Sequence, residues 1–357
     1  MKKHTVYKAL SLFLPIQIMG VYFIQRQLKV SQNGLYNSFY VFLVGILRKT
    51  NAIFPFSVGD IFYTFIFLLS LYYLISIFRK KSWFFVLKIT SLLSVLYFCF
   101  YLFWGLNYNR TPLYETLNLN FNNSKALLLN KLCTQLIYKA NILQLQLAKS
   151  DTLKVTAPYD KKSILIKSAA SYKNLAKVFP FLRYKNPNIK FSLYSKPLSY
   201  MGYSGYYNPF SAEAQVNYEV PQTQLPFTSC HEIAHQIGFA PEQEANFIGY
   251  LACINSDDAF VQYSGYLVAL SYALNNLKYI DNKAYNKILY SINKGIFKNY
   301  RENNKFWQAH KNPTTPLFES VYDKFLKANK QASGIKSYSG IVKLLLAYHK
   351  DHPLKKT

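Results

Sequence analysis

The sequence reads His231-Glu-Ile-Ala-His-Gln-Ile-Gly238 and, two residues later, Pro241-Glu-Gln-Glu-Ala-Asn246. On a helix, residues four apart lie on one face, so the side chains of His231 and His235 can reach one point. Zinc binds such an imidazole pair at about 2.0–2.1 Å, and hydrolytic zinc sites keep one position for water. The carboxylate of Glu232 can reach that water without binding the metal. We therefore expect a helical zinc site in which Glu232 is the general base.

The third zinc ligand is expected on the following helix. The glycine and the proline quoted above are typical of a helix end and of the first turn of a new helix. That turn carries Glu242 and Glu244, and Asn246 lies one turn after Glu242, where an amide can orient a ligand carboxylate. The segment is similar to the Glu-x-x-Ala-Asn pattern of several HExxH peptidase families, in which the first glutamate is the ligand. We predict Glu242, with Glu244 as the alternative, because the spacing from His235 is short.

The composition limits the partners of the chain. It has 357 residues, of which 51% are hydrophobic, and a formal net charge of +26. The lysines are scattered rather than gathered in one run, and no nucleic-acid-binding motif is present, so no nucleic acid partner is expected. The four cysteines form no Cys-x-x-Cys pair, which argues against a zinc ribbon or a redox motif.

Residues 1–108 are predicted to form a membrane anchor. Apolar runs at residues 9–24, 61–78 and 84–107 are predicted to cross the membrane. The first run is slightly short and is expected to be interrupted near Pro15; no cleavage site for a signal peptide follows it. The apolar run at residues 35–47 is too short to span and predicts an interfacial or re-entrant helix.

The distribution of cations predicts the orientation. The positive-inside rule places Lys2, Lys3 and Lys8, together with residues 79–81, in the cytoplasm. With three spans, the rest of the chain then lies on the outer side. The cations at residues 26, 29, 48 and 49 oppose this prediction, which leaves two spans with a cytoplasmic domain as the alternative.

Residues 109–357 are predicted to form one zincin-like metallopeptidase domain of α+β type, mainly helical with a small β-sheet. The site helix is expected to begin near Phe227 or Thr228. Apolar spacing predicts the other helices at residues 124–149, 161–179, 259–278, 282–296 and 316–328. Alternation of apolar and polar residues predicts strands at residues 188–194 and near 212–218. The second strand either offers a free edge to an extended peptide substrate or belongs to an ordinary hairpin.

Two further groups of side chains bear on function. Tyr263 and Tyr266 follow the ligands in sequence, and a tyrosine hydroxyl there can stabilise the oxyanion of a tetrahedral intermediate. His349 and His352 lie in a Lys-rich tail and are expected to face solvent.

The chain resembles DUF3810, a bacterial family of uncharacterised membrane proteins grouped with HExxH zinc metallopeptidases. The resemblance is carried by four stretches: Phe54–Asp60, Phe103–Arg110, Gly205–Asn217, and Cys230–Gly238 with Glu242–Asn246. It implies membrane attachment and a zincin-like domain but no substrate. By the same resemblance, Glu213 and Asn217 are expected to line the cleft.

The sequence therefore predicts a multi-pass protein of the bacterial inner membrane with a periplasmic or otherwise extracytoplasmic zinc metallopeptidase domain. Its expected partners are membrane lipid and a peptide or protein substrate. Two alternatives stay open. One is a zinc-binding protein without catalytic activity that acts as a binding or assembly module, and the other is a zinc amidase that acts on cell-wall peptide.

Overall fold

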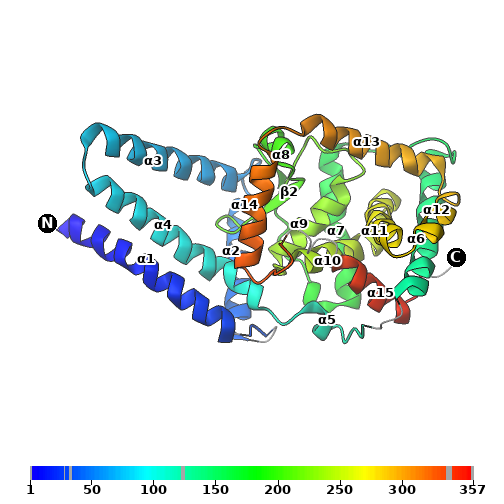
Figure 1. The fold of residues 1–357 in the computed structure, drawn as a ribbon, viewed down its shortest axis with the longest axis horizontal. Helices are drawn as coiled ribbons and strands as arrows, with labels where there is room; N and C mark the ends of the chain where they lie inside the picture. Colours follow the sequence, from blue (N-terminus) through cyan, green and yellow to red (C-terminus); the bar gives the residue numbers. More distant parts are fainter. Residues whose placement is uncertain (1, 28, 32–33, 122–124, 335–339, 355–357) are drawn as a thin grey trace.

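The computed structural model describes residues 2–27, 29–31, 34–121, 125–334 and 340–354. The chain is mainly helical and contains a small three-stranded sheet. Figure 1 shows long N-terminal helices spread out on one side of the molecule, while the other elements pack together on the opposite side. The predicted fold class, helices with a small sheet after an apolar N-terminal region, is confirmed at this level.

Three helices among the described residues are long and apolar enough to cross a membrane, which indicates membrane association. They are α1 (Lys2–Gln27), α3 (Val58–Lys80) and α4 (Phe84–Phe103). The predicted interruption near Pro15 is wrong, because α1 runs through that residue. Proline is tolerated in such helices when neighbouring groups compensate for its missing N–H. Polar side chains also join α1 to α4. For example, Gln17 Nε2 donates to Ser94 Oγ at 2.7 Å.

The last of these helices is shorter than predicted. It ends at Phe103 instead of continuing to residue 107, and the 3₁₀ helix η1 (Gly105–Asn109) follows it. Trp104, with φ −149° and ψ −52°, breaks the helical path at this point. The Asn107 side chain then donates to the Trp104 carbonyl at 3.0 Å and satisfies a backbone group at the helix end.

Helix α2 (Leu35–Asn51) joins the apolar helices to the rest of the fold. Its buried residues are Tyr40, Val44 and Arg48. The Tyr40 hydroxyl donates to the Gln236 carbonyl at 3.2 Å, and the Arg48 guanidinium lies 5.2 Å from the centre of the Tyr184 ring. One face of α2 is therefore packed against protein; its placement at a membrane interface stays a prediction.

The sheet has the strand order β1-β3-β2. Strand β1 (Ile189–Phe191) is parallel to β3 (Glu213–Val216), and β2 (Gly205–Asn208) is antiparallel to β3. The predicted free edge at residues 212–218 is wrong, because β3 is paired on both sides. Strands β2 and β3 form an ordinary hairpin, and β2 is an edge strand, as is β1.

The remaining helices surround a core that contains the site helix. The bounds, in chain order, are α5 (Leu113–Thr116), α6 (Lys125–Ala148), α7 (Lys161–Val178), η2 (Pro180–Leu182), α8 (Ser195–Met201), α9 (Leu225–Gln236), α10 (Glu242–Ile254), α11 (Ala259–Ile280), α12 (Asn282–Leu289), α13 (Lys294–His310), α14 (Thr315–Ala328) and α15 (Ile341–Asp351). Buried apolar residues of α6, α7, α9, α10, α11 and α15 belong to one hydrophobic cluster. The sheet lies against α9 on the side of the apolar helices (Figure 1).

Three predictions about these helices need correction. The site helix begins at Leu225, earlier than predicted, with Pro226 in its first turn. The predicted helix at residues 282–296 is divided into α12 and α13. His349 is only 7% exposed and lies on α15, so the expectation that it faces solvent is wrong.

Candidate metal centre and its cavity

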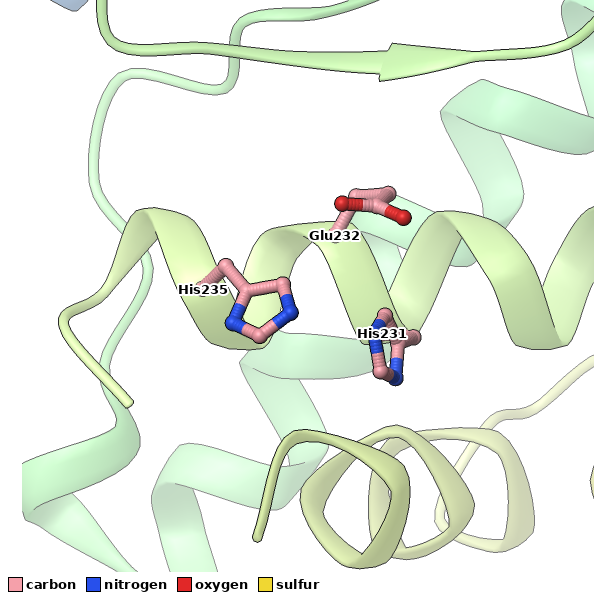
Figure 2. Close-up of side chains that lie close together, drawn as sticks. All are labelled: His231, Glu232 and His235. Atoms are coloured by element: carbon pink, nitrogen blue, oxygen red, sulfur yellow. The ribbon is translucent and has the colours of Figure 1, made fainter. Parts of the chain in front are cut away.

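Helix α9 presents two imidazoles and a carboxylate close together. His231, Glu232 and His235 are buried, and their ligand atoms lie within 4.8 Å of one another. The two histidine rings are nearly perpendicular, at 89°, with centroids 4.7 Å apart. Figure 2 shows both imidazoles on the side of α9 that faces a neighbouring helix, whereas the Glu232 carboxylate rises toward a strand. The predicted i, i+4 pair is therefore formed.

Glu242, at the start of α10, supplies the group that faces both imidazoles. Its Oε2 atom lies 3.2 Å from His231 Nε2 and 3.5 Å from His235 Nε2. Two ligands on a tetrahedral zinc ion, each about 2.0–2.1 Å from it, are about 3.3 Å apart. The two nitrogens and this oxygen therefore have the spacing of zinc ligands. They fit the metal better than a set including Glu232, because that carboxylate leaves the helix in another direction (Figure 2).

Neighbouring groups hold these candidate ligands in position. The Tyr322 hydroxyl donates to Glu242 Oε1 at 2.7 Å, which leaves Oε2 toward the histidines. The Glu242 backbone N–H donates to Gln331 Oε1 at 3.1 Å. His235 Nδ1 lies 2.8 Å from the Phe239 carbonyl, which can only accept, so Nδ1 keeps its proton and a metal would displace the proton of Nε2.

The alternative ligand Glu244 lies elsewhere. Its Oε1 atom accepts the Leu113 backbone N–H at 2.8 Å, and its carboxylate faces Arg110. It lines a separate cavity with Lys29, Arg110 and Gln331. The structure therefore brings Glu242, and not Glu244, to the two histidines.

The Glu232 carboxylate faces β2, one of the two edge strands of the sheet. A Cβ added at Gly205 of β2 would lie 2.8 Å from Glu232 Oε1, so this strand approaches the carboxylate as closely as a glycine permits. The other oxygen, Oε2, is buried without a hydrogen-bond partner among the described residues. Burial raises the pKa of Glu232 to about 7, although the adjacent histidines oppose the shift. A carboxylate with a pKa near neutrality suits proton transfer in both directions.

Glu242, whose carboxylate faces both histidines, has the opposite electrostatic character. Burial acts to raise the pKa of Glu242, but the charges of and hydrogen bonds from His235 and His231 outweigh it and hold the pKa well below its usual range. Burial likewise disfavours the charged form of His235, yet the Glu242 carboxylate raises its pKa to about 9. The two carboxylates thus differ in role: Glu242 is fixed as an anion toward the histidines, and Glu232 can exchange a proton.

The site opens into a cavity with two adjoining parts, which share several lining residues. One part, of about 350 Å³, is lined by Gln224, Thr228, Asn246, Tyr272 and Glu319. The other, of about 500 Å³, is lined largely by aromatic residues of η1, α3, α4, β2 and α14. His231, Glu232, Gly205 and Tyr322 line both parts. A ligand lying in both parts therefore passes the Glu232 carboxylate.

The other predicted site residues separate into two groups. Asn246, one helical turn after Glu242, lines the cavity and is hydrogen-bonded to Tyr272. Asn217 lies behind the cavity wall, where its Nδ2 atom donates to Ser199 Oγ at 2.9 Å and to the Tyr203 carbonyl at 3.0 Å.

Like Asn217, which lines neither part of the cavity, three more predicted residues are not brought to the cleft. Glu213 is a buried residue of β3 and forms an ion pair with Lys190 at 2.7 Å. The Tyr263 hydroxyl donates to Asn299 Oδ1 at 2.9 Å inside the core. Tyr266 packs edge-on against Tyr250, with ring centroids 6.1 Å apart, and does not line the cavity.

The site contains residues that the sequence did not identify. Tyr322 contacts Glu242 from α14, and Trp104 contacts His235 from the end of α4, with ring centroids 5.8 Å apart. Neither has a distinguishing local signal, since the chain has 32 tyrosines and Trp104 ends an apolar run. The Phe103–Arg110 stretch, quoted above for the family resemblance, was the one available indication for Trp104.

Comparison with known proteins gives one finding. A family model described as "Protein of unknown function (DUF3810)" matches residues 36–346. The chain belongs to the DUF3810 family. A search of the curated proteins and a search of the solved structures found no match to this chain.

In this DUF3810 protein the four stretches that carry the resemblance meet around the site. Trp104 packs edge-on against His235, and Glu213 accepts the Gly59 backbone N–H at 2.6 Å. Gly238 ends the site helix at φ +99°, where a Cβ would lie 2.3 Å from Arg110 Nη2. Only glycine meets both the backbone and the space requirements at this position. The stretches thus form one structural unit that joins the apolar helices to α9.

Proposed function

We propose that this protein is a membrane-anchored zinc metallopeptidase. One observation carries the proposal: two imidazole nitrogens and a carboxylate oxygen converge at zinc-ligand spacing beside a second, buried carboxylate in a cavity. The position of α9 between a small sheet and α10 further supports a zincin-like domain.

The residues of the site have distinct roles in this proposal. His231, His235 and Glu242 hold the zinc ion, and Tyr322 orients Glu242. Bound zinc supplies Lewis acidity, which lowers the pKa of water to about 7 and polarises the scissile carbonyl. Glu232 accepts one proton of the attacking water and then donates it to the leaving amine nitrogen. The peptide C–N bond is broken, the carbonyl carbon gains OH and the nitrogen gains H.

The arrangement of the apolar helices supports a multi-pass protein with an extracytoplasmic site. The beginning of α3 and the end of α4 contact the site domain, through Gly59 and Trp104. The N-terminus and the connection from α3 to α4 lie at the far end (Figure 1). That end carries Lys8 and residues 79–81, so the positive-inside rule places it in the cytoplasm. Of the opposing cations, Arg48 is buried in protein and carries little weight.

The test is metal content and peptide cleavage by the purified full-length protein. We expect about one zinc per chain and hydrolysis of peptides from a randomised mixture, detected by mass spectrometry. Glu232→Gln should keep the metal and lose hydrolysis, while His231→Ala should lose both. Absence of zinc at near-stoichiometric level would contradict the proposal. Retained metal with no cleavage of any peptide would favour the binding module instead.

A further inference from the structure

The part of the cavity that faces the apolar helices differs in chemistry from the rest. Near Gln224, Thr228 and Glu319 the lining carries amide, hydroxyl and carboxylate groups. Toward α3 and α4 it consists mainly of rings, including Tyr63, Phe100, Trp104 and others. A ligand that fills both parts therefore needs a polar portion and an apolar portion, joined close to Glu232.

The apolar part adjoins a groove between the predicted spans. This groove, of about 440 Å³, is lined by apolar and aromatic side chains of α1, α3 and α4 together with Phe210. Tyr63 and Phe100 line both the groove and the cavity of the site. These three helices are long and apolar enough to cross a membrane, and in a bilayer that they cross the groove faces hydrocarbon. The groove is thus the neighbour, at Tyr63 and Phe100, of the cavity part that His231 and Glu232 line.

The size of the groove limits what can occupy it. A helix that crosses the bilayer is about 30 Å long and at least about 10 Å wide, which corresponds to on the order of 2,000 Å³. Such a helix does not fit a groove of about 440 Å³. A single hydrocarbon chain is narrow and flexible and needs no hydrogen-bond partner, so it suits both the shape and the lining.

We infer that the substrate is an acylated peptide, whose hydrocarbon chain lies in the groove between α1, α3 and α4 while its peptide portion crosses Glu232 into the polar part of the cavity. This inference rests on the proposed peptidase function and adds the substrate class. The bond that is hydrolysed is a peptide C–N bond close to the acylated residue. The hydrocarbon chain anchors the substrate in the bilayer and presents the peptide at the end of α4.

The experiment uses the full-length, zinc-loaded protein in phosphatidylcholine vesicles. A randomised peptide mixture is offered with N-terminal palmitoyl groups and, separately, with N-terminal acetyl groups. Ile66→Trp fills the groove, because Ile66 lines it. The matched control is Leu68→Trp on the same helix, since Leu68 is 56% exposed and does not line the groove. We expect the palmitoylated mixture to be cleaved at least tenfold faster, and Ile66→Trp but not Leu68→Trp to abolish that advantage.

A photo-crosslinking arm separates this inference from the proposed function. A palmitoyl peptide with a diazirine in its acyl chain should label α3 or α4 near Tyr63 or Phe100, and unlabelled palmitoyl peptide should compete. Equal cleavage of the two mixtures overturns the acyl-peptide inference but leaves the peptidase proposal intact. Labelling that palmitoyl peptide does not displace also overturns it, because bilayer phospholipid then fills the groove. Saturable labelling without cleavage supports acyl-peptide binding and contradicts the peptidase function.

Discussion

At the scale of single residues, Tyr322 has the clearest role that can be tested without removing a candidate ligand. Its hydroxyl donates to Glu242 Oε1 at 2.7 Å, and its ring lines both parts of the cavity. Tyr322→Phe keeps the ring and removes the hydrogen bond. Loss of such a supporting bond typically weakens metal binding 10–100-fold, so we expect a zinc dissociation constant raised by about that factor. Competition with a zinc chelator measures it.

The control for this variant is Tyr200→Phe. Tyr200 is 43% exposed, packs against His310 and does not line the cavity. Its zinc affinity should equal that of the wild type. Equal affinity in Tyr322→Phe as well would mean that the hydroxyl does not orient the carboxylate.

The two neighbouring glutamates give a second prediction. Glu242→Gln removes the anionic oxygen that faces both imidazoles and should reduce bound zinc to a small fraction of one per chain. Glu244→Gln keeps a side-chain oxygen for the Leu113 backbone N–H and should leave zinc content unchanged. Elemental analysis of the two purified variants decides between the glutamates. The reverse result would make Glu244 the ligand.

Buried His349 gives a prediction about pH. The Tyr250 hydroxyl lies 2.8 Å from Nε2 and the His352 carbonyl 2.8 Å from Nδ1, which defines a neutral ring. Burial lowers the pKa of His349 from 6.5 to about 4. Between these values the unfolded chain binds a proton that the folded chain does not. The stability is therefore complete above about pH 6.5 and falls as the pH drops toward 4, by about 2 kcal/mol at pH 5.

The variant His349→Gln isolates this effect. His352 lies next to His349 and acts on its pKa, and burial raises the pKa of the two tyrosines packed around the ring, Tyr250 and Tyr348, so both stay neutral over this range. Thermal unfolding in detergent between pH 7 and pH 5 should show a smaller loss of midpoint temperature in the variant than in the wild type. Parallel losses in both proteins would assign the pH effect to other groups.

The sequence could identify the residues of α9 but not all of their partners. The i, i+4 spacing of His231 and His235 fixes their common face on any helix, and the structure has that pair. The choice between Glu242 and Glu244 required the direction of the first turn of α10, which depends on how that helix packs. Tyr322 lies 80 residues from Glu242 in sequence. Its approach is a tertiary contact that no local pattern encodes.

At the scale of elements, the beginning of α3 is the joint between the apolar helices and the sheet. Ser57 caps the helix by accepting the Asp60 N–H at 3.0 Å, and Glu213 of β3 accepts the Val58 and Gly59 N–H groups. A carboxylate at a helix N-terminus is favoured by the helix dipole. The Asp60 carboxylate in turn accepts the Leu193 N–H at 2.7 Å. The orientation of α3 relative to the site domain therefore depends on this small group of buried bonds.

Gly59 tests that joint. A Cβ at this position would lie 2.4 Å from Asn208 Nδ2 and 2.5 Å from Ser211 Oγ, both on buried side chains. Gly59→Ala should therefore destabilise the protein by about 1–3 kcal/mol through overpacking. Gly45→Ala on α2 is the matched control, because nothing lies within 4 Å of its Cβ. A lower unfolding midpoint in Gly59→Ala alone is the expected result; equal midpoints would show that α3 adjusts without cost.

The division between α12 and α13 shows why some element boundaries could not be predicted. Apolar spacing continues through residues 282–296, but the structure turns before Lys294. The Asn293 N–H donates to Asn141 Oδ1 at 3.0 Å, and its side chain donates to Gln144 Oε1 at 2.8 Å. A Cβ at Gly295 would lie 2.1 Å from the Leu153 carbonyl oxygen. Contacts with the distant helix α6 and with the loop that follows it thus decide a boundary that local propensity leaves open.

At the scale of the whole molecule, the arrangement of the apolar helices places the site domain and the connection between α3 and α4 at opposite ends of these helices (Figure 1). The N-terminus and the connection between α3 and α4 lie together at the end away from the site domain (Figure 1). Either orientation in the membrane is compatible with the fold, because the fold fixes only that this end and the site domain lie at opposite ends of the apolar helices. The cations at the far end favour a cytoplasmic location for it, and hence an outer location for the site.

Cysteine labelling tests this orientation. Trp83, between α3 and α4, is 82% exposed, and Tyr290, after α12, is 93% exposed. The four native cysteines are buried or partly buried, so the wild type provides the background. A membrane-impermeant maleimide should label Tyr290→Cys but not Trp83→Cys in spheroplasts, and the reverse in inverted vesicles, because a bilayer separates the two positions. Labelling of both variants from one side would mean that α3 and α4 do not cross the membrane as proposed. The opposite pattern would place the cavity of Glu232 in the cytoplasm, and the substrate would then have to reach the groove from the inner leaflet.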